Sequence, residues 1–248
     1  MKKLFVIVFV LLAAATAFSQ KDSIVNKPKK KDWSKVSLSN RSNDHFMVQI
    51  GYDGWAGRPD TIRTKGFSRS FNLYFMFDFP FKTDPRFSIG AGLGIGSSNI
   101  FFDKEKVLVA SPGNQTLAFQ DVSGTDHYKK FKLVTTYIEV PLEIRFAFDP
   151  ENNNKSWKIA LGAKIGTMLS AYTKGKTLQN NAGQTINNLI EKESSKKYFS
   201  SPRLAGTARI SYGVFGIFGQ YQVNSLLKNT GLNPAIHPFA IGIVFSGL

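Results

Sequence analysis

The sequence contains no cysteine, which excludes a disulfide framework, a thiolate metal site and a lipid-modified N-terminal cysteine. Long apolar runs are also missing. After residue 19 there is no stretch of 18 or more apolar residues, so the sequence predicts no transmembrane helix. Histidine is scarce, and His45, His127 and His237 are scattered without carboxylates at ligand spacing. We therefore expect no metal site.

Motifs for nucleotide binding and nucleophilic catalysis are missing too. The glycines at positions 90, 92, 94 and 96 alternate with other residues, and no frame of them fits G-x-G-x-x-G. No helix pattern follows them, and the chain has no nucleophile elbow. The sequence therefore predicts no cofactor and no enzymatic activity.

The N-terminus has the pattern of a signal peptide. Lys2 and Lys3 precede an apolar run of residues 4–18, and Ala17 and Ser19 are small residues before a cleavage at Gln20. The run is too short to span a bilayer comfortably, so a membrane anchor is the weaker interpretation. We predict that residues 1–19 are removed on export.

The chain is basic, with a formal net charge of +15, but the charge is spread along the sequence. Nucleic acid is an improbable partner for an exported protein. The densest basic run lies at residues 27–35, within a Lys-rich segment that we expect to be flexible and periplasmic over residues 20–43. Its predicted partners are anionic lipid or wall material.

Phenylalanine is abundant, with 22 residues, and it recurs at every second position. In the segment 67–79 the odd positions are almost all apolar, and the even positions are mostly polar. Strict alternation over 13 residues indicates a strand longer than the usual globular length and suited to a tilted membrane strand. The same pattern predicts eight strands, at residues 46–53, 67–79, 87–96, 134–146, 157–169, 203–212, 215–221 and 239–245.

The connections between these strands alternate in length. Short turns are expected at residues 82–85, 149–155 and 212–213, and long loops at residues 56–66, 97–130, 173–201 and 224–237. This alternation is typical of outer-membrane barrels, in which the turns are periplasmic and the loops lie outside. The predicted fold class is all-β, an eight-stranded antiparallel up-and-down transmembrane β-barrel over residues 44–248. The loop 173–201 is the predicted contact surface for an envelope protein.

Aromatic residues collect near the predicted strand ends, as expected for girdles at headgroup depth. Those toward the short turns are Phe77, Phe79, Phe87, Phe146, Trp157, Phe215 and Phe245. Those toward the long loops are Tyr52, Trp55, Tyr172 and Tyr221. The lipid of the outer membrane is therefore a predicted partner.

An eight-stranded barrel is just wide enough for side chains to fill it, so no open pore is expected. If residues 67–79 and 87–96 pair through a turn near Thr83, Tyr74 lies opposite Gly92 and Met76 opposite Gly90. Pro141 interrupts a paired strand and predicts an inward-facing bulge.

The predicted inner face carries charges of both signs, which need partners in a confined interior. We expect a structural salt-bridge network there; an ion relay or a catalytic pair at Glu139 and Glu143 is the alternative. The network is predicted to contain Asp78, Glu139, Glu143, Arg145, Lys158, Lys164, Arg203 and Arg209.

Two segments carry a resemblance to a known family. Residues 137–146 (YIEVPLEIRF) and 213–221 (GVFGIFGQY), with 226–228 (LLK) after the latter, resemble hallmark strands of the outer-membrane β-barrel family of Bacteroidota, which includes PorT-like proteins. The resemblance covers residues 44–248 and implies a barrel in the outer membrane. The PorT branch implies a part in type IX secretion.

Three functions remain open from the sequence. The favoured one is a non-enzymatic integral outer-membrane barrel with a structural, adhesive or envelope-complex role. The second is a lipid-modifying barrel enzyme, which would need a Ser/His/acid cluster at the lipid boundary. The third is a soluble lipocalin-like barrel, in which the apolar face would point inward. Periodicity alone does not say which face is inside.

Overall fold

The computed structural model describes residue 32 and residues 46–110, 116–228 and 235–247. The predicted signal peptide and, apart from Asp32, the predicted Lys-rich segment lie outside these residues. Within the described part of the chain, no helix has the length and hydropathy needed to cross a membrane.

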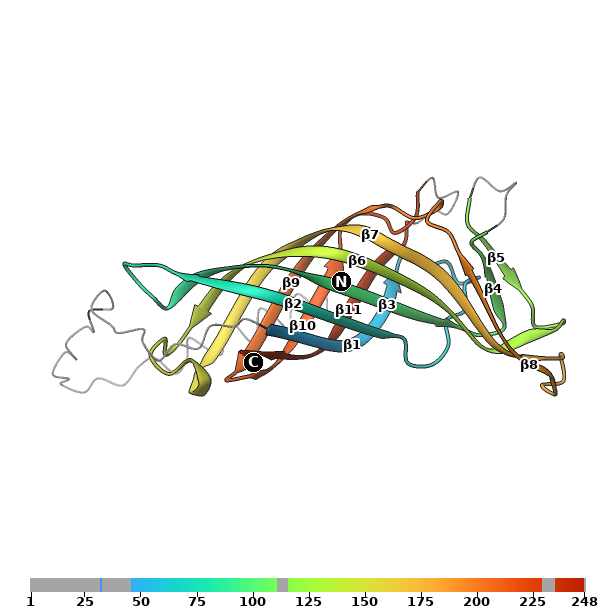
Figure 1. Cartoon of the computed structure of the whole chain (residues 1–248), viewed down its shortest axis with the longest axis horizontal. Coiled ribbons are helices and arrows are strands. Elements are labelled where there is room, and N and C mark those ends of the chain that lie inside the picture. Colours follow the sequence, from blue (N-terminus) through green and yellow to red (C-terminus); the bar gives the residue numbers. More distant parts are fainter. Residues whose placement is uncertain (1–31, 33–45, 111–115, 229–234, 248) are drawn as a thin grey trace, which may run out of the picture. The chain divides into compact units, whose positions relative to one another are not determined.

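Eight antiparallel strands close into a ring, which confirms the predicted fold (Figure 1). Consecutive strands of the ring pair with each other, β1 pairs with β11, and β6 pairs with β7. Because the ring has no free edge, its strands pair their backbone groups with each other, as a span of the lipid bilayer requires. The ring strands are β1 (Phe46–Ala56), β2 (Arg69–Pro80), β3 (Phe87–Phe102), β6 (His127–Ala147), β7 (Trp157–Gln179), β9 (Pro202–Tyr212), β10 (Phe215–Gln222) and β11 (His237–Ser246).

Three further strands correct the predicted loops at residues 97–130 and 173–201. β6 and β7 have 21 and 23 residues, about twice the length that crosses a membrane. β7 continues into a hairpin with β8 (Thr185–Ser194), and β4 (Glu105–Leu108) pairs with β5 (Ala118–Asp121) beside it (Figure 1). The long connections are therefore largely sheet. β8 was not predicted from the sequence because both of its faces are mostly exposed, so apolar and polar residues do not alternate along it.

The apolar face of each ring strand points outward. On β2, Phe75 is 39% exposed, whereas its neighbours Tyr74 and Met76 are fully buried inside the barrel. Polar side chains such as Gln49 and Asn72 are buried on the same inner face. This arrangement rules out the lipocalin-like alternative, which requires an apolar interior and a water-facing exterior.

Cross-strand aromatic pairs form at the end of the barrel that carries the short turns. The ring centroids of Phe87 and Phe146 are 4.9 Å apart, and those of Phe215 and Phe245 are 5.2 Å apart. Trp157 and Tyr212 form a third pair at 5.4 Å. These rings lie where the predicted girdle places them.

Trp55 was wrongly predicted as a girdle residue at the other end. It is buried inside the barrel, with its ring 5.7 Å from the ring of Phe102. Trp55 has the same parity along β1 as the inward residues Gln49 and Asp53, so the alternation of β1 already placed it inside. The prediction followed the position of an aromatic residue near a strand end instead.

Two details of strand pairing also differ from prediction. Tyr74 lies opposite Gly94 and Met76 opposite Gly92, a slip of two residues from the predicted register. The register of β6 against β7 shifts between Thr136 and Tyr137, and not at Pro141, which is buried and pairs in register with Lys164. β6 therefore accommodates the missing N–H of Pro141 without an extra residue.

Candidate functional site

The centre of the barrel is filled by Lys164 of β7 and its partners. Lys164 is 1% exposed, and its Nζ donates hydrogen bonds to Tyr74 Oη at 2.8 Å and to Gln220 Oε1 at 2.8 Å. It also donates to Gln49 Oε1 at 3.2 Å, which in turn accepts from Asn72 Nδ2 at 3.0 Å. Side chains from β1, β2, β7 and β10 thus meet at one ammonium group.

Glu139 of β6 carries the negative charge that faces this ammonium. The Tyr74 hydroxyl donates a hydrogen bond to Glu139 Oε2 at 2.5 Å, and Arg203 Nη1 donates one to Glu139 Oε1 at 2.7 Å. The Arg203 guanidinium also lies over the ring of Tyr137, 5.0 Å from its centroid. Both oxygens of this buried carboxylate are therefore hydrogen-bonded, which a charge inside a barrel requires.

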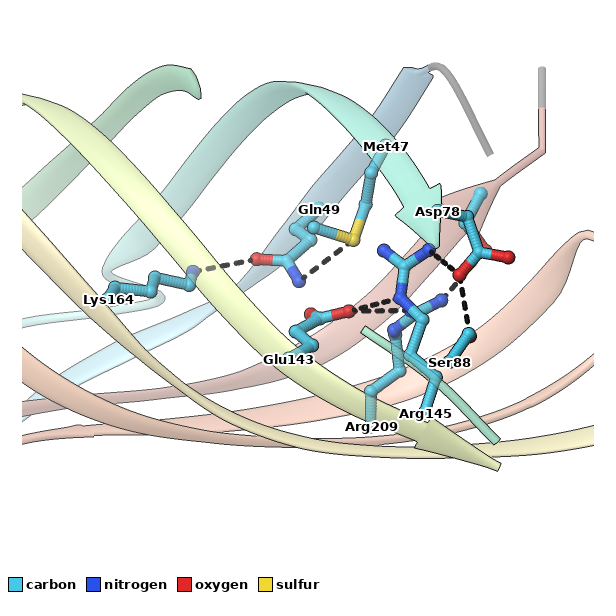
Figure 2. Close-up of polar contacts among 9 residues, drawn as sticks. Met47, Gln49, Asp78, Ser88, Glu143, Arg145, Lys164 and Arg209 are labelled. Carbon is cyan, nitrogen blue, oxygen red and sulfur yellow. Dashed lines mark hydrogen bonds and ion pairs between the residues drawn. The ribbon is translucent and has the colours of Figure 1, made fainter. Parts of the chain in front are cut away.

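A second ionic cluster surrounds Glu143, which lies four residues after Glu139 on the same inner face of β6 (Figure 2). Glu143 Oε2 accepts from Arg145 Nε and from Arg209 Nη2, both at 2.9 Å. Arg145 Nη1 is 3.4 Å from Asp78 Oδ1, which also accepts from Ser88 Oγ at 2.6 Å. The cluster joins β2, β3, β6 and β9 across the interior.

All eight residues predicted for the interior network lie on the inner face, and seven of them share the contacts just described. Lys158 is the eighth; it is buried and lines a cavity of about 10 Å³ together with Asp78, Arg145 and Arg209. A cavity of this size holds at most a single water molecule. The assignment of these residues to a structural network remains our proposal.

Glycines on β3 give the charged side chains their room. A Cβ at Gly90 would lie 2.4 Å from Arg145 Nε, and one at Gly96 would lie 2.8 Å from Glu139 Oε2. At Gly94 a Cβ would lie 2.1 Å from the backbone oxygen of Leu73. The alternating glycines of the sequence therefore make space for large side chains that reach in from β2 and β6.

A hydrophobic cluster closes the end of the barrel that carries the long connections, and the sequence analysis missed it. Residues of the loops, of β4 and of the adjoining ends of the ring strands turn inward and pack together. Its buried members are Trp55, Ile62, Ile100, Phe102, Val107, Val109, Leu117, Phe131, Leu133, Tyr137, Met168, Ala171, Tyr198, Phe199, Leu226, Leu227 and Ile236. The backbone bridge between Phe199 and Leu227 ties two of these loops to each other. Between this cluster and the ionic network lies a cavity of only about 10 Å³.

The geometry offers little to acid–base or metal chemistry. Glu139 and Glu143 are each held by at least one arginine, so neither carboxylate is poised to take up a proton. Nδ1 of His127 contacts the backbone oxygen of Thr125, and Nδ1 of His237 contacts that of Gln222; His45 lies outside the described residues. Among the residues that the structure describes, no three His, Asp or Glu side chains are placed to hold a metal ion.

A closed eight-stranded ring with an apolar exterior and an ionic interior defines a transmembrane β-barrel. The family comparison agrees: residues 19–239 match the family described as outer membrane protein beta-barrel domain, and the chain belongs to that family. It is accordingly an integral barrel protein of the outer membrane.

Solved structures that match include two of Ail, the attachment invasion locus protein of Yersinia pestis. The chain is 14% identical to Ail alone, with a TM-score of 0.34, and 12% identical to Ail in complex with the heparin analogue sucrose octasulfate, with a TM-score of 0.32. Each match covers 82% of this chain and 98% of Ail. The chain matches none of the curated protein sequences.

Proposed function

We propose that this protein is a non-enzymatic outer-membrane scaffold without an open pore. We further propose that the β-extension, which consists of β8 and the adjoining ends of β6 and β7, presents a contact surface outside the cell. The observation that carries the proposal is the filled lumen. Lys164, Tyr74 and Gln220 come from three strands of the ring and meet at hydrogen-bonding distance in its centre. A barrel sealed in this way transports nothing through its axis, so its work lies on its surfaces.

The extension beyond the membrane supplies such a surface. β8 pairs with β7 along one edge, and the sheet order ends at β8. Ile186 and Ile190 are 52% and 59% exposed on this edge strand. Tyr128 donates a hydrogen bond to Glu191 and so fixes β8 to β6 as well. An ordered edge strand with exposed apolar residues favours a protein partner that pairs with it.

Conductance in planar bilayers tests the sealed lumen. We expect the purified barrel to insert without steady conductance steps. The matched control is a variant with the central side chains removed, Tyr74→Gly with Lys164→Gly, checked for folding by its mobility on gels with and without boiling. Steady opening of the unmodified barrel would show that the lumen conducts and that the proposal is wrong.

Protease treatment of intact cells tests the extension. We expect the first cut in the β7–β8 connection, at residues 180–184, because it lies at the tip of the hairpin that leaves the membrane. The short turn at residues 82–85 should be cut only after the cells are lysed. Cleavage in the reverse order would mean that β8 faces the periplasm.

The finer assignments follow from sequence and remain part of this proposal. Residues 1–19 are proposed as a cleaved signal peptide, residues 20–43 as a periplasmic segment and residues 44–248 as the barrel domain. The resemblance to PorT-like barrels of Bacteroidota makes the type IX secretion machinery a candidate partner. Deletion of the gene should then reduce the amount of secreted cargo in the medium; normal secretion would remove that candidate.

A further inference from the structure

The outward surface of the barrel changes from apolar to basic at the end that carries the long connections. On β2, the exposed ring of Phe71 is followed toward this end by Arg69, and the exposed Phe67 lies beyond Arg69, before the strand begins. On β6, the outward positions lead from Ile138 toward the same end of the barrel and reach Lys132 and then Lys130. In an outer-membrane barrel this end faces outside, so the basic residues lie at and above the border of the outer leaflet.

These side chains line a groove of about 460 Å³ formed by β2, β3, β6 and β7 together with residues 65–67 of the connection before β2. Lys174 and Lys176 of β7 complete its basic wall, and Phe101 of β3 contributes an apolar floor. Of the described residues that line the groove, none is an aspartate or glutamate. Lys65, at one end, is the lining residue that has a salt bridge, with Asp103 at 3.0 Å.

The strand register concentrates the positive charge. Lys132 lies directly opposite Lys174, and Lys130 lies directly opposite Lys176. Like charges in directly opposed positions of an antiparallel pair destabilise the sheet. An anion bound between the strands would offset the repulsion in both of these adjacent lysine pairs.

Lys132 has specific contacts with β3 within the groove. Its Nζ donates to Asn99 Oδ1 at 2.8 Å and lies 5.7 Å from the centroid of the Phe101 ring, and the Arg69 guanidinium lies 6.0 Å from the same centroid. Burial lowers the pKa of Lys132, and the nearby charges of Lys174 and Arg69 lower it further. An anion in the groove would reverse this effect and favour the charged amine.

The position of the groove selects the anion. Phe67 lines the groove itself, and Phe71, the next outward residue on the membrane side of Arg69, is 47% exposed, so a ligand in the groove has acyl chains beside its charged group. Guanidinium and ammonium groups together bind phosphate strongly. We propose that this groove binds the phosphate groups of a phosphorylated glycolipid in the outer leaflet, with Arg69, Lys132 and Lys174 as its central contacts.

Binding of lipid A to the folded barrel in detergent micelles, followed by native mass spectrometry, tests the proposal. The expected order is strong binding of bisphosphorylated lipid A, weaker binding of its dephosphorylated form and weak binding of inorganic phosphate. The double variant Lys132→Gln with Lys174→Gln should bind lipid A about tenfold more weakly, since charged hydrogen bonds are lost. The matched control, Lys82→Gln with Lys155→Gln, removes two exposed lysines at the short turns and should bind as the unmodified barrel does.

Three results would overturn the proposal. Dephosphorylated lipid A could bind as tightly as the phosphorylated form, or both double variants could lose the same affinity. Tighter binding of a soluble polyanion such as polyphosphate would assign the groove to a ligand from outside the membrane. Gel mobility with and without boiling shows that each variant is folded. The inference holds whether or not the lumen conducts, so the two proposals fail separately.

Discussion

Lys164 of β7 and Glu139 of β6 are linked through one hydroxyl group, that of Tyr74 on β2. The hydroxyl accepts a hydrogen bond from Lys164 Nζ at 2.8 Å and donates one to Glu139 Oε2 at 2.5 Å. Arg203 holds the other oxygen of the same carboxylate. The interior is therefore a connected set of charges in which the loss of one member leaves others buried without a partner.

Glu139→Gln should destabilise the barrel strongly. The substitution keeps the shape of the side chain but leaves the charges of Arg203 and Lys164 buried without their carboxylate, which costs about 3–5 kcal/mol. Reversible urea unfolding of the barrel in lipid vesicles measures the change. The double variant Glu139→Gln with Arg203→Met removes both partners and should recover part of the loss. A single variant as stable as the unmodified barrel would contradict the network.

Gly94→Ala should destabilise the barrel by packing against the backbone of β2. The new Cβ would lie 2.1 Å from the backbone oxygen of Leu73, and overpacking of this kind costs about 1–3 kcal/mol. Gly206→Ala is the matched control, because a Cβ at that position meets no atom within 4 Å. The same unfolding assay should show a loss for Gly94→Ala alone. Equal effects at the two positions would mean that the glycine is not needed for room.

Leu93→Arg should destabilise the barrel in lipid by about 2–4 kcal/mol, the cost of a charge on the lipid face near the bilayer midplane. Ile190→Arg on β8 is its control. Leu93 and Ile190 have similar exposed fractions, 54% and 59%, but the second lies on the extension beyond the membrane and should tolerate the charge. A loss of equal size at both positions would mean that exposure, and not contact with lipid, sets the cost.

Binding of phosphorylated glycolipid should weaken as the pH rises toward 10.5, the ordinary pKa of a lysine. The pKa of Lys132 is lowered by burial, then by Lys174 of β7 and Arg69 of β2, while Asn99 and Phe101 of β3 face it without charge. Binding needs the protonated amine of Lys132, so affinity is present at pH values below the lowered pKa of Lys132 and is lost as the pH rises above that pKa. Lys132→Arg should keep its charge and move the loss to higher pH. Identical pH profiles would exclude Lys132 as a phosphate contact.

The alternation of side chains made the eight ring strands and the inner charged residues predictable. Period two identifies a face but is unchanged when a strand slips by two residues, which is why the partner of Tyr74 was misplaced from Gly94 to Gly92. The same pattern left open which face is inside, and the exposed Phe75 beside the buried Met76 resolves that question.

The extension and the hydrophobic closure could not be predicted in the same way. β8 has no buried face, so its sequence shows no contrast between alternate positions. The closure brings Ile62, Phe199 and Leu227 together from loops that are far apart in the chain, and only the fold places them in contact. Pro141 misled for a different reason: the pairing of β6 with β3 is interrupted beside it but resumes in the same register, with Ala91 opposite Leu142 and Gly94 opposite Glu139.

The most direct measurement uses the absence of cysteine, which lets a spin label be placed at one position at a time. Phe75→Cys and Met76→Cys put labels on adjacent residues of β2 in the barrel reconstituted into lipid vesicles. We predict frequent collisions of the label at position 75 with oxygen dissolved in the bilayer, and a label at position 76 that is shielded from oxygen. A shielded label at position 75 beside an oxygen-accessible label at position 76 would contradict the outward orientation of the phenylalanine face.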